Sequence, residues 1–138
     1  EFASNLTTSR NLNMSSTEPM TLQPRQERTI MDVTSVEIGT EESVLHAEGK
    51  MGEYGKVYST VRFKYNSDRS GGTFTDEGRG FLDENTMLSG TGMGIWRREG
   101  SKVILEELIN VSDGTQNFHR SVWDARENKI VVDSYIIR

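Results

Sequence analysis

Glycine occupies every second position in two neighbouring stretches of this chain, and that spacing constrains the fold more than any other feature. The glycines concerned are Gly78, Gly80, Gly90, Gly92 and Gly94. Alternate residues of a β-strand point to the same face of a sheet, so a period of two is typical of strands. A row of glycines on one face leaves room there for a ligand, a plug or another backbone. The spacing therefore predicts adjacent strands that border an interior space.

The rest of the chain also reads as strands joined mostly by short turns. Alternation of apolar and polar residues predicts eight strands, at about 30–38, 45–51, 57–65, 73–83, 86–98, 102–111, 115–125 and 129–137. Thirteen glycines against two prolines fit an all-β chain with tight turns. A meander of eight strands can remove its edges by closing on itself. We therefore expect an all-β fold, an eight-stranded antiparallel up-and-down barrel, over residues 29–138.

The N-terminal residues 1–28 differ from the rest, because they are polar, rich in Ser, Thr and Asn, and without a sustained period. The first of them could derive from an expression vector rather than from the native gene. Two interpretations of this extension stay open. It is either a mobile tail or an arm that crosses a partner or plugs one mouth of the barrel.

Composition and charge exclude several classes of function. The formal net charge is −5 with the basic residues dispersed, whereas a nucleic-acid-binding domain needs a basic face. The chain has no cysteine, so it has neither a disulfide nor a thiolate nucleophile. No apolar run reaches the ~20 residues of a membrane span and no signal-peptide core is present, so we expect a cytoplasmic protein. His46 and His119 are expected on the outer face, and we predict neither a metal site nor a cofactor.

The turns allow neighbouring strands to be placed in register. We expect two-residue turns at 113–114 and 99–100 and a three-residue loop at 84–86, which together put Glu107 opposite Arg120. All three hairpins then assign one common face to the barrel interior. Besides the glycines, its predicted members are Phe74, Leu82, Leu88, Trp96, Val103, Leu105, Ile109, Val111, Phe118 and Val122.

Three ionisable side chains, Asp76, Glu107 and Arg120, fall on this otherwise apolar face. Glu107 and Arg120 could form a structural ion pair near a barrel mouth. Alternatively the three form a polar handle in an apolar cavity, where Arg120 orients a ligand oxygen and Asp76 or Glu107 is the acceptor or general base. Burial should raise the pKa of Asp76, which lacks a basic neighbour in this register. We predict these three as catalytic residues, and as ligand-binding residues Phe63, Phe74, Gly78, Gly92, Trp96, Leu105 and Phe118.

The predicted outer face carries apolar side chains over the same strands. They are Phe81, Met93, Ile95, Ile104, Leu108 and Trp123. A contiguous patch of this kind marks an interface more often than scattered apolar residues do. We therefore expect a homo-oligomer, either a dimer or a trimer.

The segments EGRGFLDENTMLSGTGMGIWRREG and ELINVSDGTQN resemble small bacterial eight-stranded barrels of the allene oxide cyclase-like and broader calycin kind. The resemblance lies in architecture and glycine-rich strands, over about residues 43–138. It implies an apolar barrel that binds a lipid-like or polyketide-like molecule, sometimes as a cofactor-free cyclase or isomerase. Three classes of function follow: a binding module for a small apolar molecule, an isomerase or cyclase of this kind, or an oligomeric structural barrel with a filled core.

Overall fold

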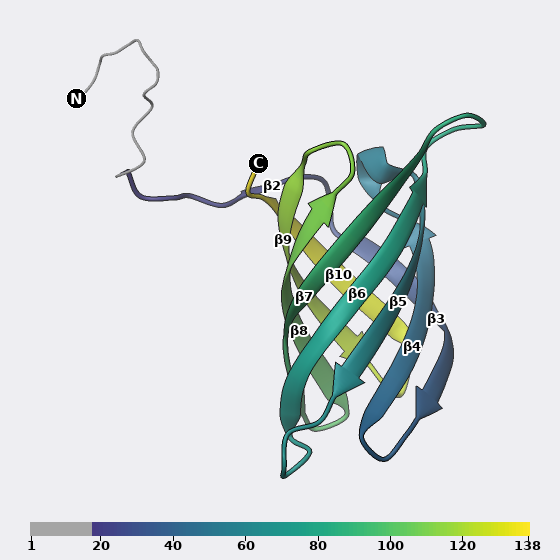
Figure 1. The fold of residues 1–138 in the computed structure, drawn as a ribbon, viewed down its shortest axis with the longest axis vertical. Coiled ribbons are helices and arrows are strands. Elements are labelled where there is room, and N and C mark those ends of the chain that lie inside the picture. Colours follow the sequence, from purple (N-terminus) through teal and green to yellow (C-terminus); the bar gives the residue numbers. More distant parts are fainter. Residues whose placement is uncertain (1–17) are drawn as a thin grey trace.

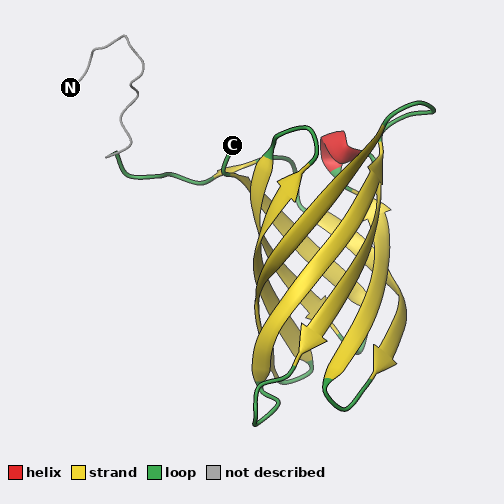
Figure 2. Ribbon diagram, in the orientation of Figure 1, coloured by secondary structure: helices red, strands yellow, loops and turns green. Residues whose placement is uncertain are grey.

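The computed structural model describes residues 18–138, in which eight antiparallel strands form a closed barrel (Figures 1 and 2). The strands are β3 (Thr29–Ile38), β4 (Glu42–Lys50), β5 (Lys56–Lys64), β6 (Gly71–Phe81), β7 (Met87–Glu99), β8 (Lys102–Val111), β9 (Gln116–Asp124) and β10 (Lys129–Ile136). Neighbours in sequence pair with one another, and β10 closes the barrel by pairing with both β9 and β3. The predicted fold class is therefore confirmed.

A short strand outside the barrel, β2 (Gln23–Pro24), pairs with the last residues of β10. The chain between β2 and β3 then passes the barrel end that also carries a single 3₁₀ turn, η1 (Gly52–Tyr54) (Figure 1). Residues 23–25 thus contact this end of the barrel, through the pairing of β2 with β10 and the hydrogen bonds of Arg25. Residues 1–17 of the predicted extension lie outside the described residues.

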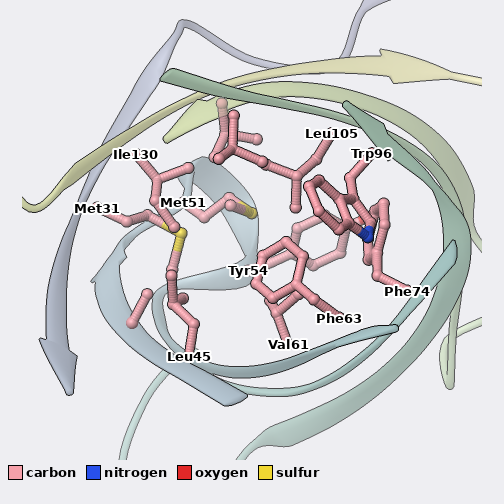
Figure 3. Close-up of a cluster of buried hydrophobic side chains, with 13 residues drawn as sticks. Met31, Leu45, Met51, Tyr54, Val61, Phe63, Phe74, Trp96, Leu105 and Ile130 are labelled. Carbon is pink, nitrogen blue, oxygen red and sulfur yellow. The ribbon is translucent and has the colours of Figure 1, made fainter. Parts of the chain in front are cut away.

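Aromatic side chains fill the barrel at the end opposite η1. Phe63 is the centre of this cluster, with ring centroids 5.7 Å from Trp96, 5.9 Å from Trp123 and 6.1 Å from Phe74. The indole of Trp96 donates a hydrogen bond to the Lys64 carbonyl at 2.9 Å, so its polar edge is satisfied. Figure 3 shows Phe63, Phe74 and Trp96 together, with Met31, Met51 and Ile130 across the barrel. The cluster closes this end of the barrel.

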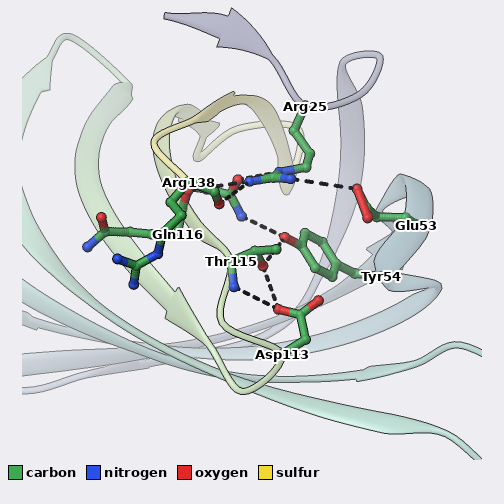
Figure 4. A network of polar contacts seen from close by, with 8 residues as sticks. Arg25, Glu53, Tyr54, Asp113, Thr115, Gln116 and Arg138 are labelled. Atoms are coloured by element: carbon green, nitrogen blue, oxygen red, sulfur yellow. Dashed lines mark hydrogen bonds and ion pairs between the residues drawn. The ribbon is translucent and has the colours of Figure 1, made fainter. Parts of the chain in front are cut away.

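A polar network occupies the other end of the barrel (Figure 4). Arg25, just after β2, donates hydrogen bonds to Asn117 Oδ1 at 2.6 Å and to the Arg138 carbonyl at 2.8 Å. Asn117 in turn donates to the Tyr54 hydroxyl at 3.0 Å, which also contacts Thr115 Oγ1 at 2.7 Å. The network ties the N-terminal arm, η1, β9 and the residues that follow β10 together.

Arg25→Met is expected to destabilise the protein by about 2–3 kcal/mol, because Asn117 would keep a buried amide oxygen without its charged donor. Urea unfolding followed by circular dichroism measures the change. Arg28→Met is the matched control. Arg28 also forms an ion pair, with Asp133, but the Arg28 side chain is 65% exposed. We expect a much smaller effect there. Equal losses in the two variants would contradict a structural role for the Arg25 network.

The β8–β9 hairpin turns through three residues, 112–114, so that Val111 bonds to Thr115. Gly114 adopts φ +92°, and Asp113 Oδ1 accepts the Thr115 amide hydrogen at 3.0 Å. This is the three-residue loop with a left-handed third position that hairpins commonly use. The predicted two-residue turn at 113–114 is therefore wrong by one residue, and every β9 side chain points to the face opposite the predicted one.

The one-residue shift of β9 reverses the predicted orientation of five residues. Phe118, Arg120 and Val122 lie on the outer surface, whereas His119 and Trp123 point into the barrel. Phe118 and Arg120 were predicted inside as ligand-binding and catalytic residues, and Val122 was also predicted inside. His119 was predicted on the outer face and Trp123 in the outer apolar patch. The structure contradicts all five placements.

The other two predicted hairpin registers are wrong by two residues, and a shift of two keeps each side chain on its predicted face. Gly94, for example, lies opposite Phe74 on β6 and Glu107 on β8. Two further residues depart from their predicted environments. Leu82 follows the end of β6 and is exposed, and Ile104 is buried although it lies on the outer face.

Candidate functional site

A cavity of about 90 Å³ lies inside the barrel, between the aromatic cluster and the Arg25 network. Most of its lining is apolar, including Met31, Ala47, Val57, Val61, Leu105, Ile109, Ile130 and Val132. Its polar side chains come mainly from β5, β6, β8 and β9, with Tyr54 from η1 and Ser89 from β7: Ser59, Asp76, Arg79, Glu107, Asn117, His119 and Ser121 are those on the four strands. These four strands and β7 are consecutive in the sheet, so the polar groups gather on one wall of an apolar cavity.

Two of the five alternating glycines border free space. A Cβ atom on Gly90 would lie 3.4 Å from Ile109 Cγ2, and one on Gly78 would lie 3.3 Å from the Tyr58 carbonyl oxygen. Both glycines line the cavity. They leave the room that the glycine spacing predicts.

The other three glycines allow close approach by other atoms of the protein. A Cβ on Gly80 would lie 2.5 Å from the Tyr54 carbonyl oxygen, so Gly80 makes room for η1. A Cβ on Gly92 would overlap the Glu107 carboxyl group. A Cβ on Gly94 would lie 2.7 Å from Glu107 Cα, so Gly94 lets the backbones of β7 and β8 come together. Part of the glycine row is thus filled by the protein itself.

Two carboxyl groups meet at the polar wall. Glu107, on β8, extends over Gly92 and forms a hydrogen bond with Asp76, on β6. Asp76 Oδ1 also accepts a hydrogen bond from the Ser59 hydroxyl at 2.5 Å. A hydrogen bond between two carboxyl groups requires a proton on one of them. Asp76 and Glu107 therefore share one proton when the pair is singly ionised.

Burial raises the pKa of Glu107 well above its usual value, and the neighbouring Asp76 charge and the hydrogen bond to Asp76 raise it further. Burial also raises the pKa of Asp76, but the hydrogen bonds from Ser59 and Glu107 act in the opposite direction. Burial thus raises the pKa of both carboxyl groups, and the two groups titrate as one coupled pair. The predicted rise in the Asp76 pKa has the expected direction.

His119 is the third ionisable group on this wall and lies opposite Glu107 in the β8–β9 ladder. It is only 6% exposed, and burial lowers its pKa to about 4, so the imidazole is neutral at physiological pH. His119 Nε2 and Glu107 Oε1 are both buried without a hydrogen-bond partner among the described residues. Buried polar atoms normally have partners, so these two atoms are where a ligand could bind.

Of the ten predicted site residues, five line the cavity: Asp76, Gly78, Gly92, Leu105 and Glu107. Three others, Phe63, Phe74 and Trp96, belong to the aromatic cluster beyond the end of the cavity. Phe118 and Arg120 are on the outer surface, where Arg120 Nε lies 3.6 Å from Glu106 Oε2. The predicted pair of Glu107 with Arg120 does not exist, and Glu107 interacts with Asp76 instead.

Sequence reasoning missed the contribution of β9, which consists of Asn117, His119 and Ser121. The signal that could have found it is the Asp113-Gly114 pair, since that pair also fits a three-residue loop. A three-residue loop would have placed His119 opposite Glu107 and Arg120 outside.

The described residues contain no group of three or more His, Cys, Asp or Glu side chains arranged to hold a metal ion. Among the helices in the described part of the chain, none has the length and apolar character needed to cross a membrane.

Comparison with protein-family models, with curated proteins and with solved structures gave no match for this chain.

Proposed function

We propose that the barrel binds a small, largely apolar molecule whose polar group meets the wall formed by Asp76, Glu107 and His119. The observation that carries this proposal is the pair of buried atoms without partners, Glu107 Oε1 and His119 Nε2, at an otherwise apolar cavity. Small-molecule sites commonly combine apolar walls with a few converging polar groups. A structural barrel with a filled core would have no need of such a cavity.

The size of the cavity limits the ligand. An engineered cavity of about 150 Å³ holds benzene, so about 90 Å³ suits a molecule of roughly four or five non-hydrogen atoms. A lipid-like or polyketide-like ligand, as the family resemblance implies, would need lining side chains to move. Met31 and Met51 are the side chains best suited to this, because methionine is unbranched and adapts its shape easily.

Native mass spectrometry of the protein, purified without denaturation from the organism that encodes it, tests the proposal. We expect a fraction of the protein to carry an added small-molecule mass. Gly90→Val should abolish that mass, because its side chain would fill the cavity. Thr91→Val is the matched control on the exposed face of the same strand and should retain it. A wild-type protein without any added mass, or a Gly90→Val variant that keeps it, would contradict the proposal.

A second candidate function is proton transfer by a cofactor-free isomerase, supported by the shared proton between Asp76 and Glu107. Asp76 would remove a proton from the carbon next to a carbonyl group, while Glu107 donates its proton to the carbonyl oxygen and forms the enol. Reversal of these steps in D₂O would place deuterium on the carbon. Butanone is a suitable probe, and NMR measures its exchange. A rate equal to that of the Asp76→Asn variant would rule this candidate out.

Self-association through the outer face is also proposed, with the patch reduced to the members that are exposed. Met93 and Leu108 are cross-strand neighbours, with Ile95 beside them and Phe81 farther along β6. Apolar surface of this kind favours an interface between copies of the chain. Light scattering at micromolar concentration should give the mass of a dimer or trimer, and a monomer mass would contradict the proposal.

A further inference from the structure

The Asp76–Glu107 pair has no basic side chain as a hydrogen-bond or ion-pair partner among the described residues. When the pair is singly ionised, the one shared proton leaves the two carboxyl groups with one net negative charge. Arg79 lies closest in sequence, but its guanidinium bonds to Glu77 and to the Gly78 carbonyl oxygen. A buried carboxylate without a cationic partner is unfavourable, and a positively charged ligand would stabilise the ionised pair.

The other ionisable groups that face the cavity add no positive charge. His119, on β9, is neutral, and the Tyr54 hydroxyl is occupied by Asn117 and Thr115. Arg25 lies at the end of the barrel and bonds to Asn117 and to backbone carbonyls. The polar wall therefore combines two carboxyl groups that lack a basic partner with acceptor atoms that have no hydrogen-bond partner among the described residues.

The acceptor atoms also match one head group in number and kind. Glu107 Oε1 accepts hydrogen bonds, and a neutral imidazole can accept one at Nε2 when its proton is on Nδ1. The Asp76 carboxyl group, whose Oδ1 accepts the Ser59 hydroxyl at 2.5 Å, is the hydrogen-bond neighbour of Glu107. A protonated amine has several N–H donors and a positive charge, whereas an alcohol has one donor and a carboxylate has none.

We infer that the ligand of this cavity is a small primary amine, bound as its ammonium form with the nitrogen between Asp76, Glu107 and His119 and the apolar chain against the opposite wall. This inference rests on the proposed binding function and specifies the chemistry of the ligand. The positive charge selects the ligand, because a carboxylate would be repelled by the acidic pair and a neutral molecule would leave it unpaired.

Three probes of equal size, n-butylamine, n-butanol and propionate, separate the possibilities. Each is titrated into ¹⁵N-labelled protein at pH 7.5 and constant ionic strength, and the amide shifts of Gly90 and Gly92 give the dissociation constants. We expect n-butylamine to bind at least about tenfold more tightly than n-butanol, because its hydrogen bonds are charged. Propionate should cause no saturable shift.

The double variant Asp76→Asn/Glu107→Gln removes the charge while keeping the shapes of both side chains. It should bind n-butylamine at least about tenfold more weakly and n-butanol as well as before. Glu106→Gln, on the outer face of the same strand, is the control and should leave all three affinities unchanged. Unchanged amine binding in the double variant would overturn the inference.

The outcomes separate the inference from the proposed function. If n-butanol or propionate binds as tightly as n-butylamine, the inference is wrong while the binding function stands. If none of the three probes binds, both are wrong.

Discussion

Gly94→Ala is expected to cost the protein about 3 kcal/mol or more in unfolding free energy, a large effect for a single added methyl group. An ideal Cβ at this position would overlap the Glu106 carbonyl oxygen and lie 2.7 Å from Glu107 Cα. Both obstacles belong to the backbone of the paired strand, so no side-chain rotation relieves the overlap. Strands β7 and β8 would have to separate, which would also displace Glu107. Urea unfolding measures the loss.

Gly90→Ala is the matched control, on the same strand and the same face. Its Cβ would lie 3.4 Å from Ile109 Cγ2, an ordinary contact, and the remaining volume is open. Alanine also restricts the unfolded chain more than glycine does, which stabilises by about 0.4–1 kcal/mol where no strain arises. We expect Gly90→Ala to be neutral or slightly stabilising. Similar losses in the two variants would show that the glycines act through strand flexibility and not through the space beside them.

The double variant Asp76→Asn/Glu107→Gln is expected to be more stable than the wild type at pH 8, by about 1–4 kcal/mol. The pKa of Glu107 is raised on folding, so the folded state binds more protons than the unfolded state once the pH exceeds about 4.5. Stability is therefore lost as the pH rises through the folded-state pKa of Glu107. The raised pKa of Asp76 acts in the same direction. Thermal unfolding between pH 4 and 9 measures both profiles, and the double variant should lack the decline on the alkaline side.

His119 gives the opposite slope on the acid side. Its pKa falls from 6.5 to about 4 on folding, so the unfolded state binds the extra proton and stability is lost as the pH falls from 6.5. The full effect is about 3 kcal/mol. His119→Gln should flatten this part of the profile, whereas His46→Gln, at the exposed histidine, should leave it unchanged.

For the acidic pair, a loss of stability at alkaline pH that persists in the Asp76→Asn/Glu107→Gln variant would contradict its assignment to Asp76 and Glu107.

The inward and outward faces of β6, β7 and β8 could be predicted from sequence because the side-chain period of a strand tolerates register errors of two residues. Both hairpins that join these strands were misaligned by two, yet Phe74, Asp76, Leu105 and Glu107 still face inward. An error of one residue has the opposite consequence. The turn at Asp113-Gly114 fits loops of two or three residues, and Gly114 has a positive φ in both. The backbone of Asp113 decides between them, because a two-residue type I′ turn needs a positive φ there and Asp113 does not have one.

The remaining features depend on contacts that leave no local pattern. The Arg25 network joins residues from both ends of the described chain, and neither Arg25 nor Asn117 belongs to an alternation that would indicate it. The glycine row was correctly interpreted as a source of space. Alternation cannot show that Gly92 houses a carboxyl group while Gly90 borders a void, because that depends on side chains from β8.

The double pairing of β10 has a consequence for biosynthesis. The strand that joins β9 to β3 is translated after all the other barrel strands, so one edge of β3 has no partner while the strands between them are made. Contacts between such distant segments make folding slow. Until β10 emerges, β3 and β9 both expose unpaired backbone groups that can template association with other nascent chains. A chain truncated before β10 would keep these backbone groups of β3 and β9 permanently unpaired.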